Sequence, residues 1–173
     1  MRTGEPRRVD HEYTRCGTAN VFCVIEPLTG WRLTRATRNR KARAYARMLD
    51  KIAKRYPEAK TIHLVQDNLN THREASLLKA FGDREGHALW KRFTVHYTPK
   101  HASWLNVAEI EAGLVARECL ARRIPTLAEL RREVTTWRQK AEREGRLINW
   151  SFRVDDARRV FRHDGIKTTR SEH

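Results

Sequence analysis

The sequence predicts an α/β domain in which helices pack against a mixed β-sheet. Short runs of apolar or alternating residues, each of strand length and bounded by turn residues, indicate strands. Longer stretches with apolar residues three and four positions apart indicate helices between and after those strands. The resulting order, β-β-α-β-α-β-α-α, is typical of an α/β fold, and a length of 173 residues fits one domain.

Each predicted element has a local signal at its boundary. The predicted elements, in chain order, are strands 19–25 and 31–37 as a hairpin, helix 41–56, strand 61–66, helix 73–82, strand 92–97, and helices 103–123 and 126–143. Gly30 suits the hairpin turn, and Pro57 ends the first helix. Gly82 suits the end of the second helix, and Thr126 with Glu129 forms a capping box for the last.

The chain divides into a short entry segment, one folded unit and a tail. Residues 1–18 are polar and have no periodicity, so we expect them to lead into the fold. Residues 19–162 contain all the predicted elements and form the folded unit. Residues 163–173 are expected to form a disordered basic tail.

The charge of the chain points to a polyanionic partner. Lysine and arginine number 36 against 21 acidic residues, which gives a formal net charge of +15. Such a surplus costs stability through self-repulsion unless an anion such as nucleic acid compensates it. The alternative is a generally arginine-rich protein with no nucleic-acid partner.

The remaining composition excludes several classes of protein. Three cysteines without paired spacing indicate neither a disulfide framework nor a zinc site. No apolar run approaches the roughly 20 residues that span a bilayer, so we expect no membrane partner. The first residues lack the apolar stretch of a signal peptide, and a cytoplasmic, nucleoid-associated location is expected.

The first candidate site residue is Asp67, which ends a predicted apolar strand. A polar loop follows it, with the sequence Asp67-Asn68-Leu69-Asn70-Thr71-His72. In open α/β sheets, ligands bind beyond the carboxyl ends of strands, where a carboxylate can face a metal ion. The alternative is an ordinary turn, because aspartate and asparagine bond readily to their own backbone.

The second candidate is Glu109, near the start of the helix that follows the last strand. Glu109 and Glu111 are two positions apart, so they point to different faces of that helix. Alone, an acid in this position is explained by the helix dipole. Together, Asp67 and Glu109 match the need of a two-metal phosphodiester site for acids on separate elements that converge at one end of a sheet.

The stretches VQDNLNTH, HYTPKHASWLNVAEIE and ECLARRIP, with GTANVFCVIEPLTGW before them, resemble the catalytic domain of IS630/Tc1-mariner transposases. The similarity covers residues 7 to about 161. It implies a ribonuclease-H-like fold, with Asp67 and Glu109 as the second and third acids of an Asp-Asp-Glu triad and as ligands of Mg²⁺ or Mn²⁺. By the same resemblance, Asn68 and His72 match polar positions beside the second acid, and Glu111 is not a ligand.

The resemblance also implies that this chain departs from its family. The first acid lies at the end of a central strand upstream of the hairpin, and the segment RRVDHEY matches the family after that strand, so Asp10 is not expected to replace it. We therefore expect a partial catalytic domain that lacks this strand, leaves an empty slot beside the hairpin, and has no useful strand-transfer activity alone. We also expect low stability, a collapsed sheet, or a partner that supplies the strand. One such partner is an upstream polypeptide made by frameshifting, which would also carry the family's helix-turn-helix, and the alternative is a decaying remnant of the gene.

DNA, as transposon ends and target, is the expected partner, and a homodimer is left open. Lys100, His101, Arg131 and Arg132 are candidate contacts with its backbone. Two other functions compete with the transposase. One is a non-catalytic DNA-binding remnant or regulator of transposition, and the other is a metal-dependent nuclease with another task.

Overall fold

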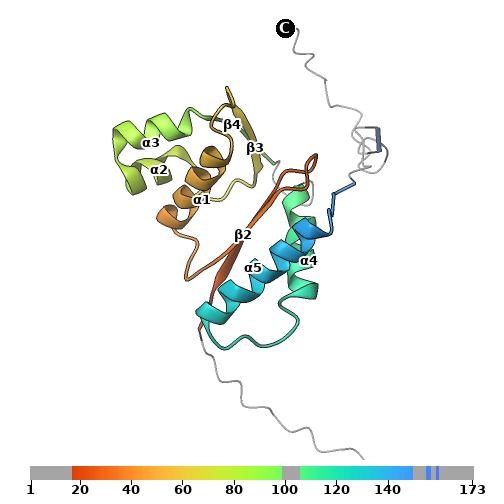
Figure 1. Cartoon of the computed structure of the whole chain (residues 1–173). Coiled ribbons are helices and arrows are strands. Elements are labelled where there is room, and N and C mark those ends of the chain that lie inside the picture. Colours follow the sequence, from red (N-terminus) through yellow and green to blue (C-terminus); the bar gives the residue numbers. More distant parts are fainter. Residues whose placement is uncertain (1–16, 99–105, 150–154, 157–158, 160–173) are drawn as a thin grey trace, which may run out of the picture.

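The structure, a computed structural model, describes residues 17–98 and 106–149 together with 155, 156 and 159. The elements, in chain order, are β1 (Asn20–Ile25), β2 (Arg32–Thr37), α1 (Ala42–Arg55), β3 (Ile62–Gln66), α2 (Glu74–Phe81), α3 (Asp83–Trp90), β4 (Phe93–Tyr97), α4 (Val107–Glu118) and α5 (Leu127–Arg143). Figure 1 shows α1, α2 and α3 grouped around β3 and β4, and α4 and α5 beside the β1–β2 hairpin. The predicted α/β class is confirmed at this level.

One face of the β1–β2 hairpin packs in one of the two buried hydrophobic clusters. β1 and β2 pair antiparallel from Asn20–Thr37 to Ile25–Arg32. Side chains of β2 alternate between buried and half-buried, as expected for a strand with one covered face. The covering helices are α4 and α5, and the buried members of this cluster are Ala36, Val115, Cys119, Val134 and Trp137.

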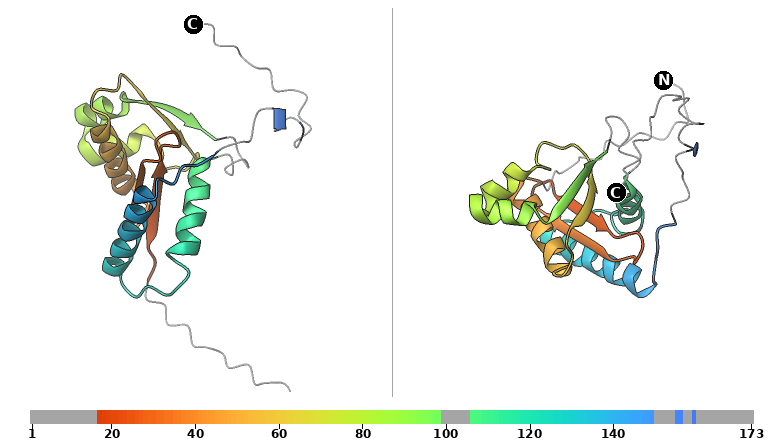
Figure 2. Two further views of the ribbon diagram at one scale, coloured as in Figure 1. Left: turned by 45° about the vertical axis from the view of Figure 1, so that its right-hand side comes forward. Right: turned by 90° about the horizontal axis from the view of Figure 1, so that it is seen from above.

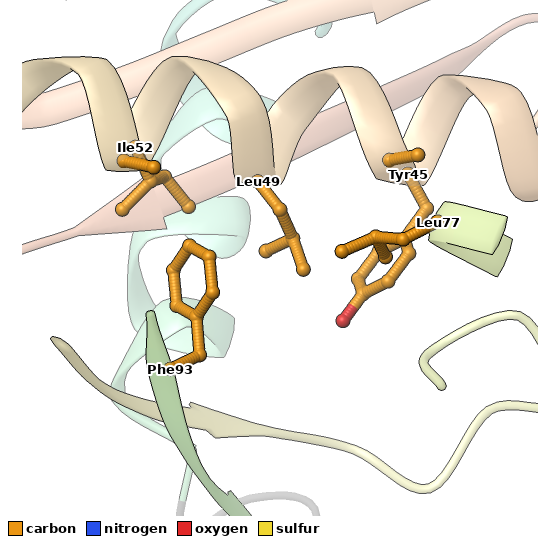
Figure 3. Close-up of a cluster of buried hydrophobic side chains, with 7 residues drawn as sticks. Tyr45, Leu49, Ile52, Leu77 and Phe93 are labelled. Atoms are coloured by element: carbon orange, nitrogen blue, oxygen red, sulfur yellow. The ribbon is translucent and has the colours of Figure 1, made fainter. Parts of the chain in front are cut away.

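β3 and β4 form a second, parallel pair, whose register runs from Ile62–Phe93 to Gln66–Tyr97. The helix α1 packs beside this pair through Tyr45, Leu49 and Ile52, which contact Leu77 of α2 and Phe93 of β4 in one buried cluster (Figure 3). This pairing fixes the end of β3, and therefore Asp67, against the first turn of α1.

The described strands form two separate two-stranded sheets rather than one. β1 has only β2 as a neighbour, and β3 has only β4, so each has one edge without a partner among the described strands. The sequence predicted a single mixed sheet with an empty slot, and two small sheets are what the described residues form. Figure 2 shows the two pairs from two further directions.

β1 and β3 run in roughly opposite directions along α1. Tyr56, directly after α1, donates its hydroxyl to Glu26, directly after β1, at 2.8 Å. Tyr45, near the start of α1, donates to the side-chain oxygen of Gln66, the last residue of β3, also at 2.8 Å. The end of β1 therefore lies at the end of α1, whereas the end of β3 lies at its start.

The predicted element bounds agree with the structure except in two places. The sequence predicted no helix between Gly82 and Arg92, where the structure has α3. Gly86 is buried and lets α3 approach α2 closely, since a Cβ there would lie 2.8 Å from the backbone nitrogen of Leu78. The helix predicted at 103–123 is shorter in the described residues, where α4 ends at Glu118 and Arg122 bonds Glu133 of α5 at 2.8 Å.

The capping prediction at the start of α5 is confirmed in its first half. The hydroxyl of Thr126 accepts a hydrogen bond from the backbone nitrogen of Glu129 at 3.1 Å.

Within the described residues, no helix is both long and apolar enough to cross a bilayer. Nearly all of the entry segment, the tail 163–173, Asp10, Lys100 and His101 lie outside the described residues.

Candidate active site

A groove of about 930 Å³ lies between the free edges of β1 and β3. Residues 19–27 form one wall, residues 61–67 form the other, and buried side chains of α1 form the floor. The first turns of α4, from Asn106 to Glu109, close one side. Most of the lining is apolar, including Val65, whose side chain is 55% exposed although it lies on a strand.

Asp67 enters this groove from a loop that several side chains hold in place. Its Oδ1 atom lies 2.5 Å from Nδ1 of His72. The backbone oxygen of His72 accepts hydrogen bonds from Gln66 Nε2 at 3.1 Å and from the Tyr97 hydroxyl at 2.8 Å. The Tyr45 ring stacks on the His72 ring with 4.6 Å between centroids. These contacts fix the Asp67 carboxylate, as a metal or substrate ligand requires.

The Asp67 carboxylate is only partly covered. Its Oδ1 atom is buried against His72, whereas the side chain as a whole is 48% exposed. Oxygen donors of this type are what Mg²⁺ and Mn²⁺ prefer, so Asp67 fits a hard divalent ion.

Glu109 lines the same groove from the first turn of α4. Asn106 caps that helix, since its side-chain oxygen accepts from the Ala108 backbone nitrogen at 3.1 Å. The Glu109 side chain is exposed, whereas that of Glu111 is fully buried on another face of α4. The two acids therefore point apart, as their spacing predicts, and only Glu109 faces the groove.

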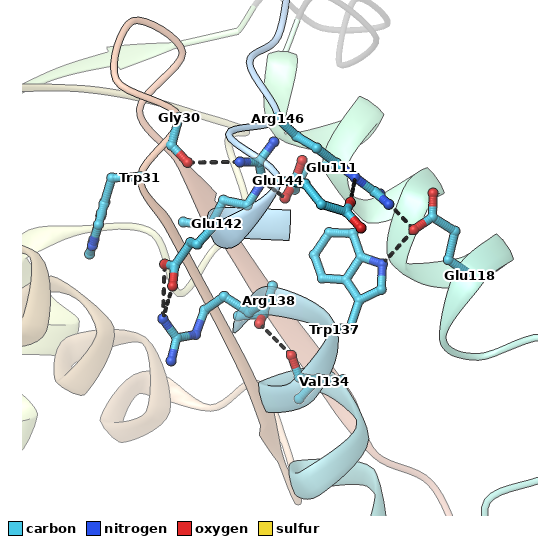
Figure 4. A network of polar contacts seen from close by, with 12 residues as sticks. Gly30, Trp31, Glu111, Glu118, Val134, Trp137, Arg138, Glu142, Glu144 and Arg146 are labelled. Atoms are coloured by element: carbon cyan, nitrogen blue, oxygen red, sulfur yellow. Dashed lines mark hydrogen bonds and ion pairs between the residues drawn. The ribbon is translucent and has the colours of Figure 1, made fainter. Parts of the chain in front are cut away.

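Glu111 has a structural role instead. Its Oε1 atom lies 2.5 Å from Nε of Arg32 at the start of β2, and both side chains are buried. Burial raises the pKa of Glu111, and the neighbouring Arg32 only partly opposes that rise. Figure 4 shows Glu111 among the contacts that join α4, α5 and the hairpin, including the bonds of Glu118 to Trp137 and Arg146.

The other predicted residues are less closely connected to the groove. His72 lines it, but Asn68 is exposed and is not part of its lining. Arg131 and Arg132 are exposed on α5 and lie outside the groove, and Nε of Arg131 donates to the backbone oxygen of Ala36 at 3.3 Å. Sequence reasoning missed Tyr45 and Gln66, because only the fold reveals that they support the Asp67 loop.

Two predicted metal ligands line the groove. Asp67 and Glu109 both line it, but the described residues contain no cluster of three or more histidine, cysteine, aspartate or glutamate side chains placed to hold a metal. Two carboxylates fit the chemistry of a hard ion, and a two-metal centre needs additional ligands.

Comparison with known proteins gives one family. The family described as DDE superfamily endonuclease matches residues 1–131, which include Asp67, Glu109 and both walls of the groove. No curated protein and no solved structure matches the chain. Members of this family act generally on DNA and depend on divalent metals. The chain belongs to the DDE superfamily of endonucleases.

Proposed function

We propose that this chain is part of the catalytic domain of an IS630/Tc1-mariner transposase with a ribonuclease-H-like fold. The observation that carries the proposal is that Asp67 and Glu109, from distant elements, line one groove. In this proposal both carboxylates hold Mg²⁺ or Mn²⁺. The ions activate the attacking water and stabilise the leaving oxygen when a DNA phosphodiester is cut.

The residues of the chain have distinct tasks in that reaction. Asp67 and Glu109 bind the ions, and His72, stacked on Tyr45, keeps the Asp67 carboxylate in place. The surplus of positive charge attracts the DNA backbone. The buried pair of Arg32 and Glu111 fixes the first turns of α4 against the hairpin, so it positions Glu109 without touching the substrate.

Two substitutions test the catalytic proposal. Asp67→Asn and Glu109→Gln each keep the shape of the side chain and remove a metal-binding charge. With the upstream polypeptide added, each should lower Mg²⁺- or Mn²⁺-dependent cleavage of a labelled transposon-end duplex by about 100-fold or more, since a ligand of the reaction centre is lost. The matched controls Asp83→Asn and Glu85→Gln, both exposed on α3, should leave cleavage unchanged.

We further propose that a β-strand encoded upstream of Met1 fills the groove and supplies another acid. The free edges of β1 and β3 run in opposite directions, so one strand can pair antiparallel to β1 and parallel to β3. The apolar walls and the exposed Val65 give such a strand a surface to bury. Without it, this chain alone is expected to show no useful strand transfer.

The strand proposal is tested by adding the polypeptide encoded just upstream. At 100 times its dissociation constant, a ligand of the folded state raises stability by about 2.7 kcal/mol, which a melting curve detects. Val65→Lys should abolish this rise, because a lysine in the groove opposes an apolar strand. Leu28→Lys, at a turn position 90% exposed and outside the groove, is the control. Retention of the rise by Val65→Lys would contradict the proposal.

A non-catalytic regulator that binds element ends is the second candidate. The absence of a three-ligand cluster among the described residues favours it. DNA binding without cleavage, both for the chain alone and with the upstream segment added, would establish this function in place of the first.

A further inference from the structure

A second cavity, of about 230 Å³, lies where β2 leads into α1. Three elements contribute to it: the end of β2 with the following turn, the first turns of α1, and α5. Among the described residues, no acid lines the cavity, and five of the lining residues are arginines, namely Arg35, Arg38, Arg43, Arg47 and Arg131. Like charges from separate elements therefore converge here.

The positive charge of the cavity is not neutralised by the carboxylates of the described residues. On α5, Glu129 and Glu133 are the acids nearest in sequence to Arg131, and both bond to Arg122. Arg131 uses its Nε to hold the backbone oxygen of Ala36. The first turn of α1 contains no acid, and no side chain caps it, so the positive end of its dipole adds to the field.

We propose that this arginine cavity binds a backbone phosphate of the DNA on which the domain acts. Arginine presents a planar pair of N–H donors that matches two oxygens of a phosphate. Several guanidinium groups around one space therefore favour an oxyanion that accepts two hydrogen bonds at once. The phosphodiester is the anion that repeats along DNA, and a net charge of +15 favours a polyanion over a small metabolite. This inference rests on the proposed function, because that function supplies the DNA.

The cavity and the catalytic groove lie on different faces of the same helix. Arg43 and Arg47 point into the cavity, whereas Tyr45 lines the groove and bonds Gln66, the neighbour of Asp67. One helix therefore separates the two sites, and the cavity is distinct from the catalytic groove.

The test compares two triple variants with the same loss of charge. Arg38→Ala/Arg43→Ala/Arg47→Ala removes three exposed side chains of the cavity. The control, Arg84→Ala/Arg117→Ala/Arg143→Ala, removes three exposed arginines of α3, α4 and α5 that do not line it. Circular dichroism and melting curves verify that both variants fold. Binding to a fluorescent 30-base-pair duplex of arbitrary sequence is then measured by anisotropy at several salt concentrations.

The cavity variant should bind DNA about tenfold or more weakly than the unmodified chain. Its plot of log affinity against log salt should become shallower by about 0.9, since the cavity binds one phosphate and each lost phosphate contact removes roughly 0.9. The control should change both quantities much less. Equal losses in the two variants would overturn the proposal, because they would show a general effect of charge.

A second probe distinguishes DNA from free phosphate. Inorganic phosphate that raises the melting temperature of the unmodified chain, but not of the cavity variant, while both bind DNA equally, would assign the cavity to a small anion and overturn the proposal. The binding assay needs no divalent metal and no cleavage. Failure of the catalytic proposal therefore appears in the cleavage assay, and failure of this one appears in DNA affinity.

Discussion

The buried pair of Arg32 and Glu111 offers a quantitative test of how α4 is held. Arg32 is 1% exposed and Glu111 is 0% exposed. Arg32 also donates from Nη1 to the backbone oxygen of Gly30 at 2.7 Å, so it joins the hairpin turn to the helix that carries Glu109. The other oxygen of Glu111 is buried and accepts no hydrogen bond among the described residues. The pair is therefore well shielded but incompletely satisfied.

Glu111→Leu keeps much of the volume and leaves the Arg32 charge buried without its partner. Removing one member of a buried pair costs about 3–5 kcal/mol of unfolding free energy. For a chain of 150–250 residues, each kcal/mol shifts the melting temperature by about 2–4 °C, so a fall of about 6–20 °C is expected. When both members are replaced with apolar residues, no charge is left buried without a partner. The cost of desolvating Glu111, which raises its pKa in the unmodified chain, is removed as well.

The measurement is a double-mutant cycle of urea or thermal unfolding with Glu111→Leu, Arg32→Met and the double variant. The double variant should recover most of the stability lost in each single variant, with a coupling of about 3 kcal/mol or more. A single-variant loss below about 1 kcal/mol, or a double variant whose loss is the sum of the two single losses, would refute this reasoning. Both outcomes would mean that solvent reaches the pair.

Other features of the fold give further expected outcomes. Gly86→Ala should cost about 1–3 kcal/mol by overpacking against the α2 backbone. Gly113→Ala, whose Cβ would meet only Arg117 Nη1 at an ordinary contact distance of 3.9 Å, should stabilise α4 by about 0.5–1 kcal/mol in the same unfolding assay. Hydrogen bonding by Arg146 lowers the pKa of Glu118, so the stability that Glu118 adds is present above its ordinary pKa of 4.5 and is lost as pH falls through the lowered value. Unfolding curves of the unmodified chain and Glu118→Gln should therefore converge as the pH is lowered, and curves that stay apart at the acid end of the titration would contradict this. Burial raises the pKa of Cys23 to about 12, so mass spectrometry should find it unmodified by iodoacetamide at pH 8, and rapid alkylation in the folded chain would count against that burial.

Much of the fold could be predicted from local patterns. The hairpin, α1, β3, β4 and α5 are all within about a residue of their predicted bounds, because apolar periodicity and turn residues are local signals. α3 was missed because its glycine matters only through its contact with α2. The same limit applies to the candidate site, where Tyr45 supports the Asp67 loop across 21 residues of sequence.

The sequence by itself determined the class of the fold and the positive charge, and it predicted one candidate acid at the end of a strand and one near the start of a helix, since each depends on residue type and spacing along the chain. Only the tertiary structure decided that Glu111 forms a buried pair with Arg32, that β1 and β3 have free edges on either side of the groove, and that five arginines from three elements share one cavity. Those facts depend on which distant surfaces bury one another. That choice follows from packing and desolvation summed over the whole domain, which no local pattern contains.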